Sequence, residues 1–189
     1  MTDAPLRDRI LDAAAGLAIG GGWSAVSMGR VAAAVGVSRQ TVHTEIGTKA
    51  DLAESLVIRE VEAFLEEVRH GFDGATDIPQ AIRRSVGGVL QRSADSPLVR
   101  GVVGASHGAD TELLPLLTTR PEQLLELASA TVAGLVAPFD PPVPQQRIGA
   151  TIEVIVRVTL SQVMHPTGTP DEVAEHLAWM VATILDANS

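Results

Sequence analysis

The sequence predicts an all-α fold: an N-terminal three-helix helix-turn-helix DNA-binding domain, then a C-terminal helical ligand-binding and dimerisation domain, with about nine helices. Two observations support this prediction. Hydrophobic residues make up 46% of the chain and aromatic residues only 3%, so alanine and leucine, both good helix formers, supply much of the core. Apolar residues recur at helical spacing, and glycines and prolines cluster between these stretches. No segment requires a strand.

The first predicted helix, residues 6–19, carries Ile10, Ala14, Leu17 and Ala18 at the i, i+4, i+7, i+8 spacing of one helix face. Three consecutive glycines at 20–22 end it. The second and third predicted helices end at Val35 and Glu45. They begin after Ser27 and Ser38, whose hydroxyls suit the N-cap position. We therefore predict a DNA-binding domain over residues 1–48.

A long fourth helix is predicted after Thr48, with an apolar stripe that includes Phe64 and Phe72. Further helices are expected over 79–95, 98–107, 112–137 (broken near Pro121), 145–165 and 171–187, with a proline-rich loop at 138–144. The break at 165–170 is short, so the last two helices should form an antiparallel hairpin. These helices form the predicted second domain, residues 49–189.

The segment from Ser27 to Lys49 has the pattern of a helix-turn-helix. Gly36 stands where the turn needs a left-handed residue, and Val42 and Ile46 face inward. The third helix then presents a polar face. Arginine, glutamine and threonine can read base edges, and the Ser38 helix start can contact phosphate. The alternative is a helical hairpin with a solvated polar face. The outward residues are Arg39, Gln40, Thr41, His43 and Thr44.

The net charge of −9 first argues against nucleic acid, but its distribution does not. Residues 1–50 hold five basic and four acidic side chains, a net charge of +1, which leaves −10 for the remainder. The acidic part would repel DNA and help to orient the N-terminal part toward it.

Several classes of protein are disfavoured. Because the chain has no cysteine, it has no disulfide framework, thiolate zinc site or cysteine nucleophile. The histidines show no i, i+4 pairing, so we expect neither a metal nor another cofactor. The start lacks a signal-peptide pattern, and Glu153 and Arg157 interrupt the most apolar stretch, so we expect a cytoplasmic protein without a membrane span.

Residues 9–56 resemble the DNA-binding region of TetR-family regulators. The matching elements are Arg9–Ala14, Trp23–Met28, Val35–Ser38, Thr41–His43 and Lys49–Leu52. The resemblance implies a regulator whose Arg39, Gln40, Thr41 and Thr44 lie toward the major groove, with Ser27, His43 and Lys49 on phosphates. This chain departs from the family's usual tyrosine at His43, its frequent histidine at Glu45 and its phenylalanine at Ile46.

A symmetric dimer would double the contacts of one helix-turn-helix and bind a palindromic operator. The last two predicted helices are apolar on more than one face, which favours a homodimer that joins them in a four-helix arrangement. The alternative is that both faces pack within one subunit. The residues predicted at the interface are Ile148, Ile152, Ile155, Thr159, Leu177, Trp179, Met180 and Ile184.

The second domain is predicted to hold a pocket between its central helices. Its candidate lining is almost wholly apolar, which predicts an apolar effector with at most one polar end. The alternative is that these are ordinary core residues. The predicted ligand-binding residues are Phe64, Val68, Phe72, Leu90, Val103, His107, Leu117 and Val156.

The polar cluster at 106–110 admits two readings. His107 contacts a ligand head group, or it stabilises a helix end that Gly108 terminates. A serine–histidine–aspartate triad is disfavoured because neighbours in one turn cannot form the relay. We therefore predict a protein that is not an enzyme.

The segment 106–119 also resembles TetR-type regulators of actinobacteria associated with alkane hydroxylase and rubredoxin genes. That implies control of alkane or fatty-acid oxidation by a long-chain effector, such as a fatty acid or acyl-CoA. The composition only permits this. The ligand-responsive repressor is preferred to a lipid-binding carrier without regulatory DNA binding, and a hydrolase that uses His107 comes last.

Overall fold

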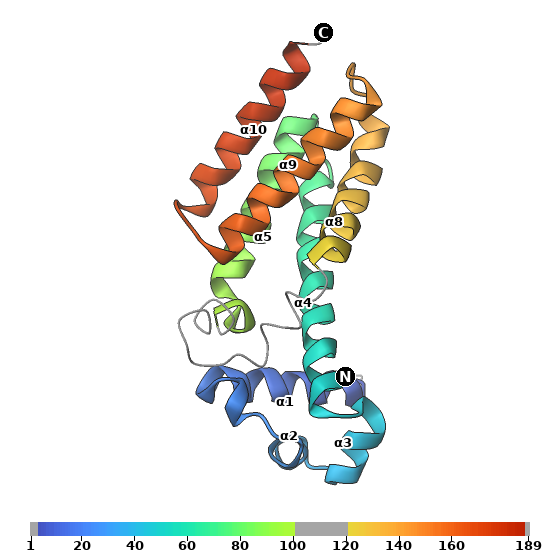
Figure 1. Ribbon diagram of the computed structural model, residues 1–189, viewed down its shortest axis with the longest axis vertical. Coiled ribbons are helices and arrows are strands. Elements are labelled where there is room, and N and C mark those ends of the chain that lie inside the picture. Colours follow the sequence, from blue (N-terminus) through green and yellow to red (C-terminus); the bar gives the residue numbers. More distant parts are fainter. Residues whose placement is uncertain (1–3, 101–120, 188–189) are drawn as a thin grey trace. The chain divides into compact units, whose positions relative to one another are not determined.

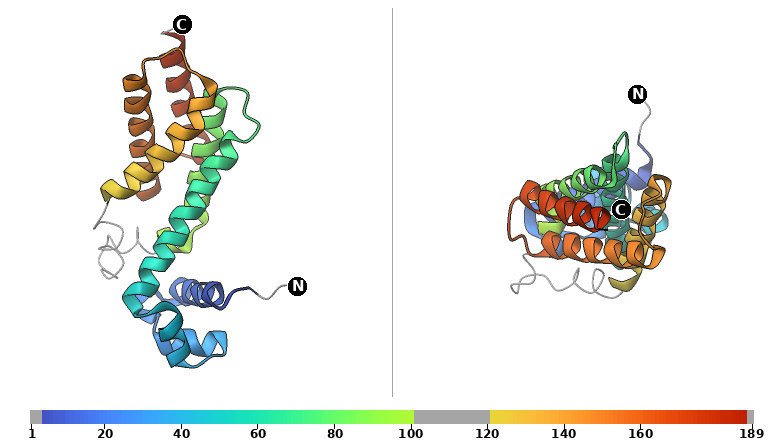
Figure 2. Two further views of the ribbon diagram at one scale, coloured as in Figure 1. Left: turned by 90° about the vertical axis from the view of Figure 1, so that its right-hand side faces the viewer. Right: turned by 90° about the horizontal axis from the view of Figure 1, so that it is seen from above.

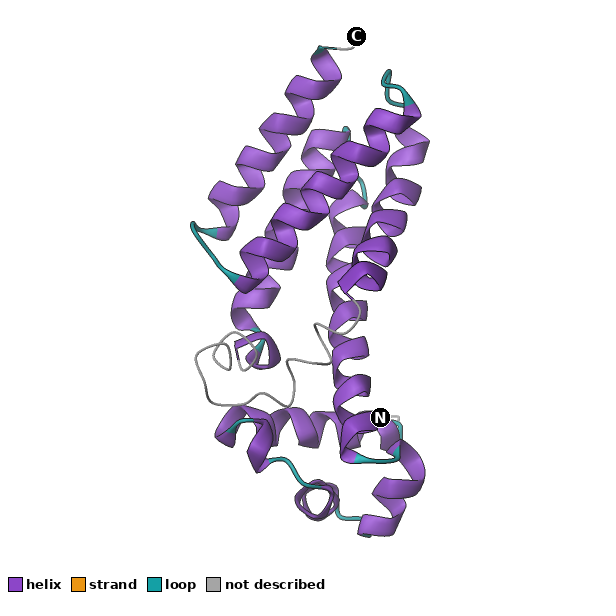
Figure 3. Ribbon diagram, in the orientation of Figure 1, coloured by secondary structure: helices purple, strands orange, loops and turns teal. Residues whose placement is uncertain are grey.

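The computed structural model describes residues 4–100 and 121–187 (Figure 1). Every regular element in these two ranges is helical, which confirms the predicted all-α fold (Figure 3). The α-helices are α1 (Leu6–Gly21), α2 (Met28–Val35), α3 (Arg39–Ile46), α4 (Lys49–Phe72), α5 (Ile78–Asp95), α8 (Pro121–Val136), α9 (Gln145–Met164) and α10 (Pro170–Asp186). Two 3-10 helices, η1 (Trp23–Ala25) and η2 (Ala137–Phe139), complete the described elements.

The predicted helix bounds agree with the structure to within a few residues, with two corrections. Gly20 and Gly21 continue α1, and the chain leaves the helix at Gly22. The predicted loop at 138–144 begins inside η2. Residues 97–100 are helical, while the rest of the helix predicted over 98–107 and the start of the one over 112–137 lie outside the described residues.

The chain forms two compact units. Among the described residues, the first unit contains 4–61 and 96–100, and the second contains 62–95 and 121–187. The chain passes from one to the other within α4. The functional division between residues 48 and 49 stays a prediction, because compactness does not show which residues bind DNA.

The first unit is built on a small core shared by α1, α2, α3 and the start of α4. Its largest fully buried side chains are Ile10, Val26, Val31, Val42 and Leu52. Burial of each such side chain stabilises the fold by about 1.5–3 kcal/mol.

Arginines tie the helices of the first unit together from outside this core. Arg9 donates a hydrogen bond to the Val35 carbonyl oxygen at 3.0 Å, and so joins α1 to the end of α2. Arg59 of α4 pairs with Asp12 of α1 at 2.6 Å. The core and these contacts fix the positions of α2 and α3.

In the second unit, α10 packs along α5, and α9 packs against both α8 and α5 (Figure 2). The helices α9 and α10 run in opposite directions, as predicted, but each makes its main contacts elsewhere. Thr169 and Glu172 form a capping box at the start of α10, with the Thr169 amide donating to Glu172 Oε2 at 2.9 Å.

The helices α4 and α5 approach closely at Gly71 and Ser85. The Ser85 hydroxyl donates to the Val68 carbonyl oxygen at 2.9 Å. A Cβ atom at position 71 would overlap the Ser85 backbone. This crossing therefore requires glycine.

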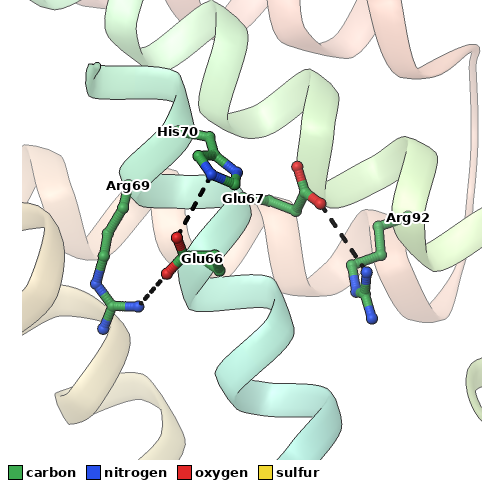
Figure 4. Close-up of polar contacts among 5 residues, drawn as sticks. All are labelled: Glu66, Glu67, Arg69, His70 and Arg92. Atoms are coloured by element: carbon green, nitrogen blue, oxygen red, sulfur yellow. Dashed lines mark hydrogen bonds and ion pairs between the residues drawn. The ribbon is translucent and has the colours of Figure 1, made fainter. Parts of the chain in front are cut away.

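Polar contacts also line this pair of helices (Figure 4). Glu67 of α4 lies 3.9 Å from Arg92 of α5. Glu66 pairs within α4 with Arg69 at 3.0 Å and contacts His70 at 3.4 Å. Because these side chains are partly or largely exposed, each pair adds at most about 1 kcal/mol.

Candidate DNA-binding and effector sites

The turn between α2 and α3 has the geometry that the sequence predicts. Ser27 caps α2, its hydroxyl oxygen accepting a hydrogen bond from the Arg30 amide at 3.3 Å. Gly36 adopts the left-handed conformation, with φ 79°. The amides of Gly36 and Val37 both donate to the Ala32 carbonyl oxygen, which closes the end of α2.

Ser38 caps α3, and its hydroxyl oxygen accepts from the Thr41 amide at 3.0 Å. Val42 and Ile46 are buried, so the inward face is confirmed, including isoleucine in place of the family's usual phenylalanine.

The opposite face of α3 is exposed at four of the five positions predicted to face outward: Arg39, Gln40, His43 and Thr44. Thr41 differs, because it is half-buried and its hydroxyl lies 2.8 Å from that of Ser38. Thr41 therefore presents less of its side chain than predicted.

Arg39 differs from the other arginines of the first unit. Arg7 donates to the Glu45 carbonyl oxygen and to the Ser55 hydroxyl, and Arg30 donates to the Ala25 carbonyl oxygen at 2.8 Å. Arg9 and Arg59 have the partners described above. Arg39, exposed on α3, makes no hydrogen bond or ion pair to the residues that the structure describes. Its guanidinium can therefore meet an external acceptor without breaking a contact.

Lys49 begins α4 next to this face. It is half-buried, and its Nζ lies 5.3 Å from the centre of the Trp23 ring. A lysine held there supplies a positive charge whose stem is already ordered.

A capping arrangement that the sequence reading missed precedes this helix. Asp51 Oδ2 accepts from the Thr48 amide at 2.7 Å and from the Thr48 hydroxyl at 2.8 Å. The backbone hydrogen bond from Thr48 is the largest cause that lowers the Asp51 pKa, followed by the Thr48 hydroxyl and, more weakly, the charge of His43. The signal was present as a threonine three residues before an aspartate.

The residues predicted to bind an effector fall into three groups. Phe64 and Val68 are half-buried on α4. Phe72, Leu90 and Val156 are buried in the second unit. The other three, Val103, His107 and Leu117, lie outside the described residues, as does the whole 106–110 cluster.

The structure has an apolar cavity of about 40 Å³ at a different place in the second unit, between α5, the 136–143 segment, α9 and α10. None of the predicted ligand-binding residues lines it. Four residues that were predicted at a dimer interface do line it: Ile148, Ile152, Ile155 and Ile184.

The predicted interface needs a further correction. Ile152, Ile155, Thr159 and Leu177 are buried within the single chain, so they cannot meet a partner without unpacking the unit. Their helix faces satisfy the alternative that the sequence left open, packing inside one subunit. Trp179 and Met180 remain exposed, at 68% and 38%.

Two further observations concern the described residues only. None of their helices is both long and apolar enough to cross a membrane. Across residues 4–100 and 121–187, no cluster of three histidine, aspartate or glutamate side chains is placed to hold a metal ion.

Comparison with known proteins agrees with this geometry. Residues 10–56 match the family of bacterial regulatory proteins of the tetR type, and residues 77–183 match the C-terminal domain of the bacterial tetracycline repressor. The chain therefore belongs to the TetR family and is a TetR-type transcriptional repressor, which is not an enzyme.

Individual relatives cover nearly the whole chain. The chain is 30% identical over 179 residues to the HTH-type transcriptional regulator AlkX of Mycobacterium tuberculosis, covering 94% of this chain and 84% of AlkX. It resembles the crystal structure of the TetR family repressor AlkX from Dietzia sp. strain DQ12-45-1b, implicated in biodegradation of n-alkanes. The TM-score is 0.74 at 27% identity, over 98% of this chain and 97% of that one.

A more distant structure shares the fold alone. The fatty acid degradation regulator FadR from Bacillus halodurans superposes with a TM-score of 0.60 at 18% identity, over 96% of each chain.

Proposed function

We propose that this repressor is ligand-responsive and controls genes of alkane or fatty-acid oxidation. The AlkX relatives support the choice of pathway, since one of them is implicated in n-alkane biodegradation. An effector would act by binding one conformation of the dimer better than another, and a few kcal/mol of differential affinity is enough to shift operator occupancy. DNA binding requires that the protein act in the bacterial cytoplasm.

The exposed face of α3 is the proposed reading surface. Arg39 is suited to guanine and Gln40 to adenine, while the Thr44 methyl can contact thymine. The observation that carries this assignment is that Arg39 is exposed and makes no contact with the described residues, whereas the neighbouring arginines are already bound.

Four side chains around this face are proposed to hold phosphates: Ser27, Ser38, His43 and Lys49. The two serine hydroxyls accept capping hydrogen bonds, and a hydroxyl that accepts can still donate its proton. His43 can donate to phosphate from an imidazole nitrogen, and Lys49 supplies a charge. We assign these roles to residues 1–48 and the first residue of α4, and sensing and dimerisation to the rest.

We propose that the homodimer forms through the exposed faces of α9 and α10. Trp179 and Met180 of α10 and Val154 of α9, which is 47% exposed, are large apolar side chains in contact with solvent in the single subunit. A tryptophan at the centre of an interface is a frequent binding hot spot. A symmetric pair of reading helices would then match a palindromic operator.

Fluorescence anisotropy with DNA from upstream of the protein's own gene tests the regulatory proposal. Hexadecanoic acid and hexadecanoyl-CoA are then added to the preformed complex. Release by either compound, with no release by a short-chain acid, is the expected result. Specific binding that neither compound changes would discard the long-chain effector and keep the repressor.

A further inference from the structure

The apolar cavity of the second unit has a lining of unusual uniformity. Six isoleucines face it: Ile78, Ile82, Ile148, Ile152, Ile155 and Ile184. These are all the isoleucines that the chain has after residue 58. Apolar residues complete the lining except at Thr151, the one polar residue. No charged side chain lines it, so it has nothing to neutralise a carboxylate or a phosphate.

The size and chemistry of the cavity define what can occupy it. A water molecule needs roughly 10–15 Å³ of such space and two to four polar partners. The cavity has about 40 Å³, enough for about three groups of that size, and a single hydroxyl. Water would therefore be poorly held, while three or four linked methylene groups would fill the space.

The cavity also has a closed end and an open end. Ile78, Ile82, Ile152 and Ile155 are buried and form its inner wall. Ile148, Thr151 and Ile184 are partly exposed and form its mouth. A hydrocarbon chain can therefore enter end first and keep a polar group, or further methylenes, outside.

We propose that this cavity binds the terminal three or four carbons of a hydrocarbon chain. The site lies away from the α4 residues that the sequence predicts as ligand-binding. It rests on the proposed function only for the occupant's role as an effector, since binding itself requires neither DNA nor a dimer. Its occupant would contact α9 and α10 together, the two helices that carry the exposed apolar residues Val154 and Trp179.

The isoleucine distribution supplies a direct measurement. The full-length protein is labelled with ¹³C at the isoleucine δ1-methyls and titrated with n-hexane without DNA. We expect saturable shifts at the cavity methyls, while Ile10, Ile19, Ile46 and Ile58 of the first unit stay in place. We also expect a rise in melting temperature of about 2–4 °C at saturation. The matched probe 1,6-hexanediol, with two polar ends, should cause neither change.

Variants separate this cavity from binding elsewhere. Ile152→Phe fills the cavity and should abolish the hexane shifts, whereas Leu127→Phe, at an exposed position of α8, should retain them. Thr151→Asp, at the partly exposed mouth, should weaken binding at least tenfold, and Thr151→Val should leave it unchanged or tighter. Thr151→Asp keeps the test valid if Ile152→Phe fails to fold.

Two results would overturn the proposal: no saturable shift at the cavity methyls in the wild-type protein, or an equal shift in folded Ile152→Phe and Thr151→Asp. Because hexane binding is measured without DNA, failure of operator binding in a separate assay would leave this result standing.

Discussion

The ammonium group of Lys49 lies 5.3 Å from the centre of the Trp23 ring, and Trp23 is only 3% exposed. The contact joins the only lysine of the chain to the core of the DNA-binding unit. A cation held against an aromatic face gains about 0.5–1 kcal/mol at an exposed site and has less freedom to lose on binding phosphate.

Substitution Lys49→Ala should weaken operator and scrambled DNA by a similar factor, because a phosphate contact carries no sequence information. The slope of log affinity against log salt should become shallower by about 0.9. Anisotropy titrations at several salt concentrations measure both effects. Lys49→Arg is the control and should keep the wild-type slope; an unchanged slope in the alanine variant removes Lys49 from the interface.

Arg39→Ala should reduce operator affinity by about 1–3 kcal/mol and relax selection at one base pair, since a bidentate arginine contact discriminates by that amount. Binding to scrambled DNA should change much less. Arg69→Ala, the same charge change in the second unit, should leave operator selection intact. Unchanged selectivity in Arg39→Ala would show that this side chain does not read bases.

Much of the first unit could be predicted from sequence because local rules decide it. Serines at caps, glycine at a left-handed turn and the apolar pair Val42 and Ile46 each leave a short-range pattern. Thr41 shows the limit of this reasoning. Helical periodicity places it outward, but its hydroxyl lies next to that of Ser38, a local contact that periodicity does not describe.

The second unit was harder to predict because its helices are apolar on several faces. Sequence periodicity shows that a face is apolar but not which neighbour covers it. Ile152 and Leu177 were therefore predicted at a dimer interface, whereas both are buried inside one subunit. The cavity was missed for the same reason, since it forms where residues from four distant segments meet.

Trp179→Ala should shift the protein from dimer to monomer at micromolar concentration, because truncation of a central tryptophan removes a large part of the apolar area of an interface. Sedimentation velocity across a concentration series measures the shift. Leu127→Ala removes another exposed apolar side chain, on α8, and should leave the dimer unchanged. Equal sedimentation of wild type and Trp179→Ala would contradict the proposed interface.

Gly71→Ala should lower the free energy of unfolding by more than about 1 kcal/mol, since the new methyl group would overlap Ser85 and force α4 from α5. Gly134→Ala provides the matched control. No atom lies within 4 Å of the added Cβ at that helical site, so this change should stabilise by about 0.5–1 kcal/mol. Urea denaturation of both variants gives the comparison, and equal effects would contradict the close crossing.

Acid should weaken the starts of α4 and α10. Hydrogen bonds from Thr48 lower the pKa of Asp51, and hydrogen bonds from Thr169 lower that of Glu172. A carboxyl with a lowered folded pKa stabilises the fold above its ordinary value, here 3.8 for Asp51 and 4.5 for Glu172, and that contribution is lost as the pH falls through the folded pKa.

The double variant Asp51→Asn, Glu172→Gln should therefore melt at a lower temperature than wild type at pH 7. The difference should shrink as the pH falls below about 4, where the wild-type carboxyls become protonated. Melting curves from pH 7 to pH 3 follow this difference, with Glu54→Gln, an exposed site on α4, as the control. A constant difference across the range would mean that the two carboxylates do not act through their charge.

The central claim, sequence-specific DNA binding through α3, is tested most directly by anisotropy on DNA from upstream of the protein's own gene, compared with a scrambled fragment over a range of salt. The account predicts operator binding at least a thousandfold tighter than scrambled binding, with a steep salt dependence for both. Equal affinity for the operator and scrambled fragments at every salt concentration, with Arg39→Ala indistinguishable from wild type, would contradict it.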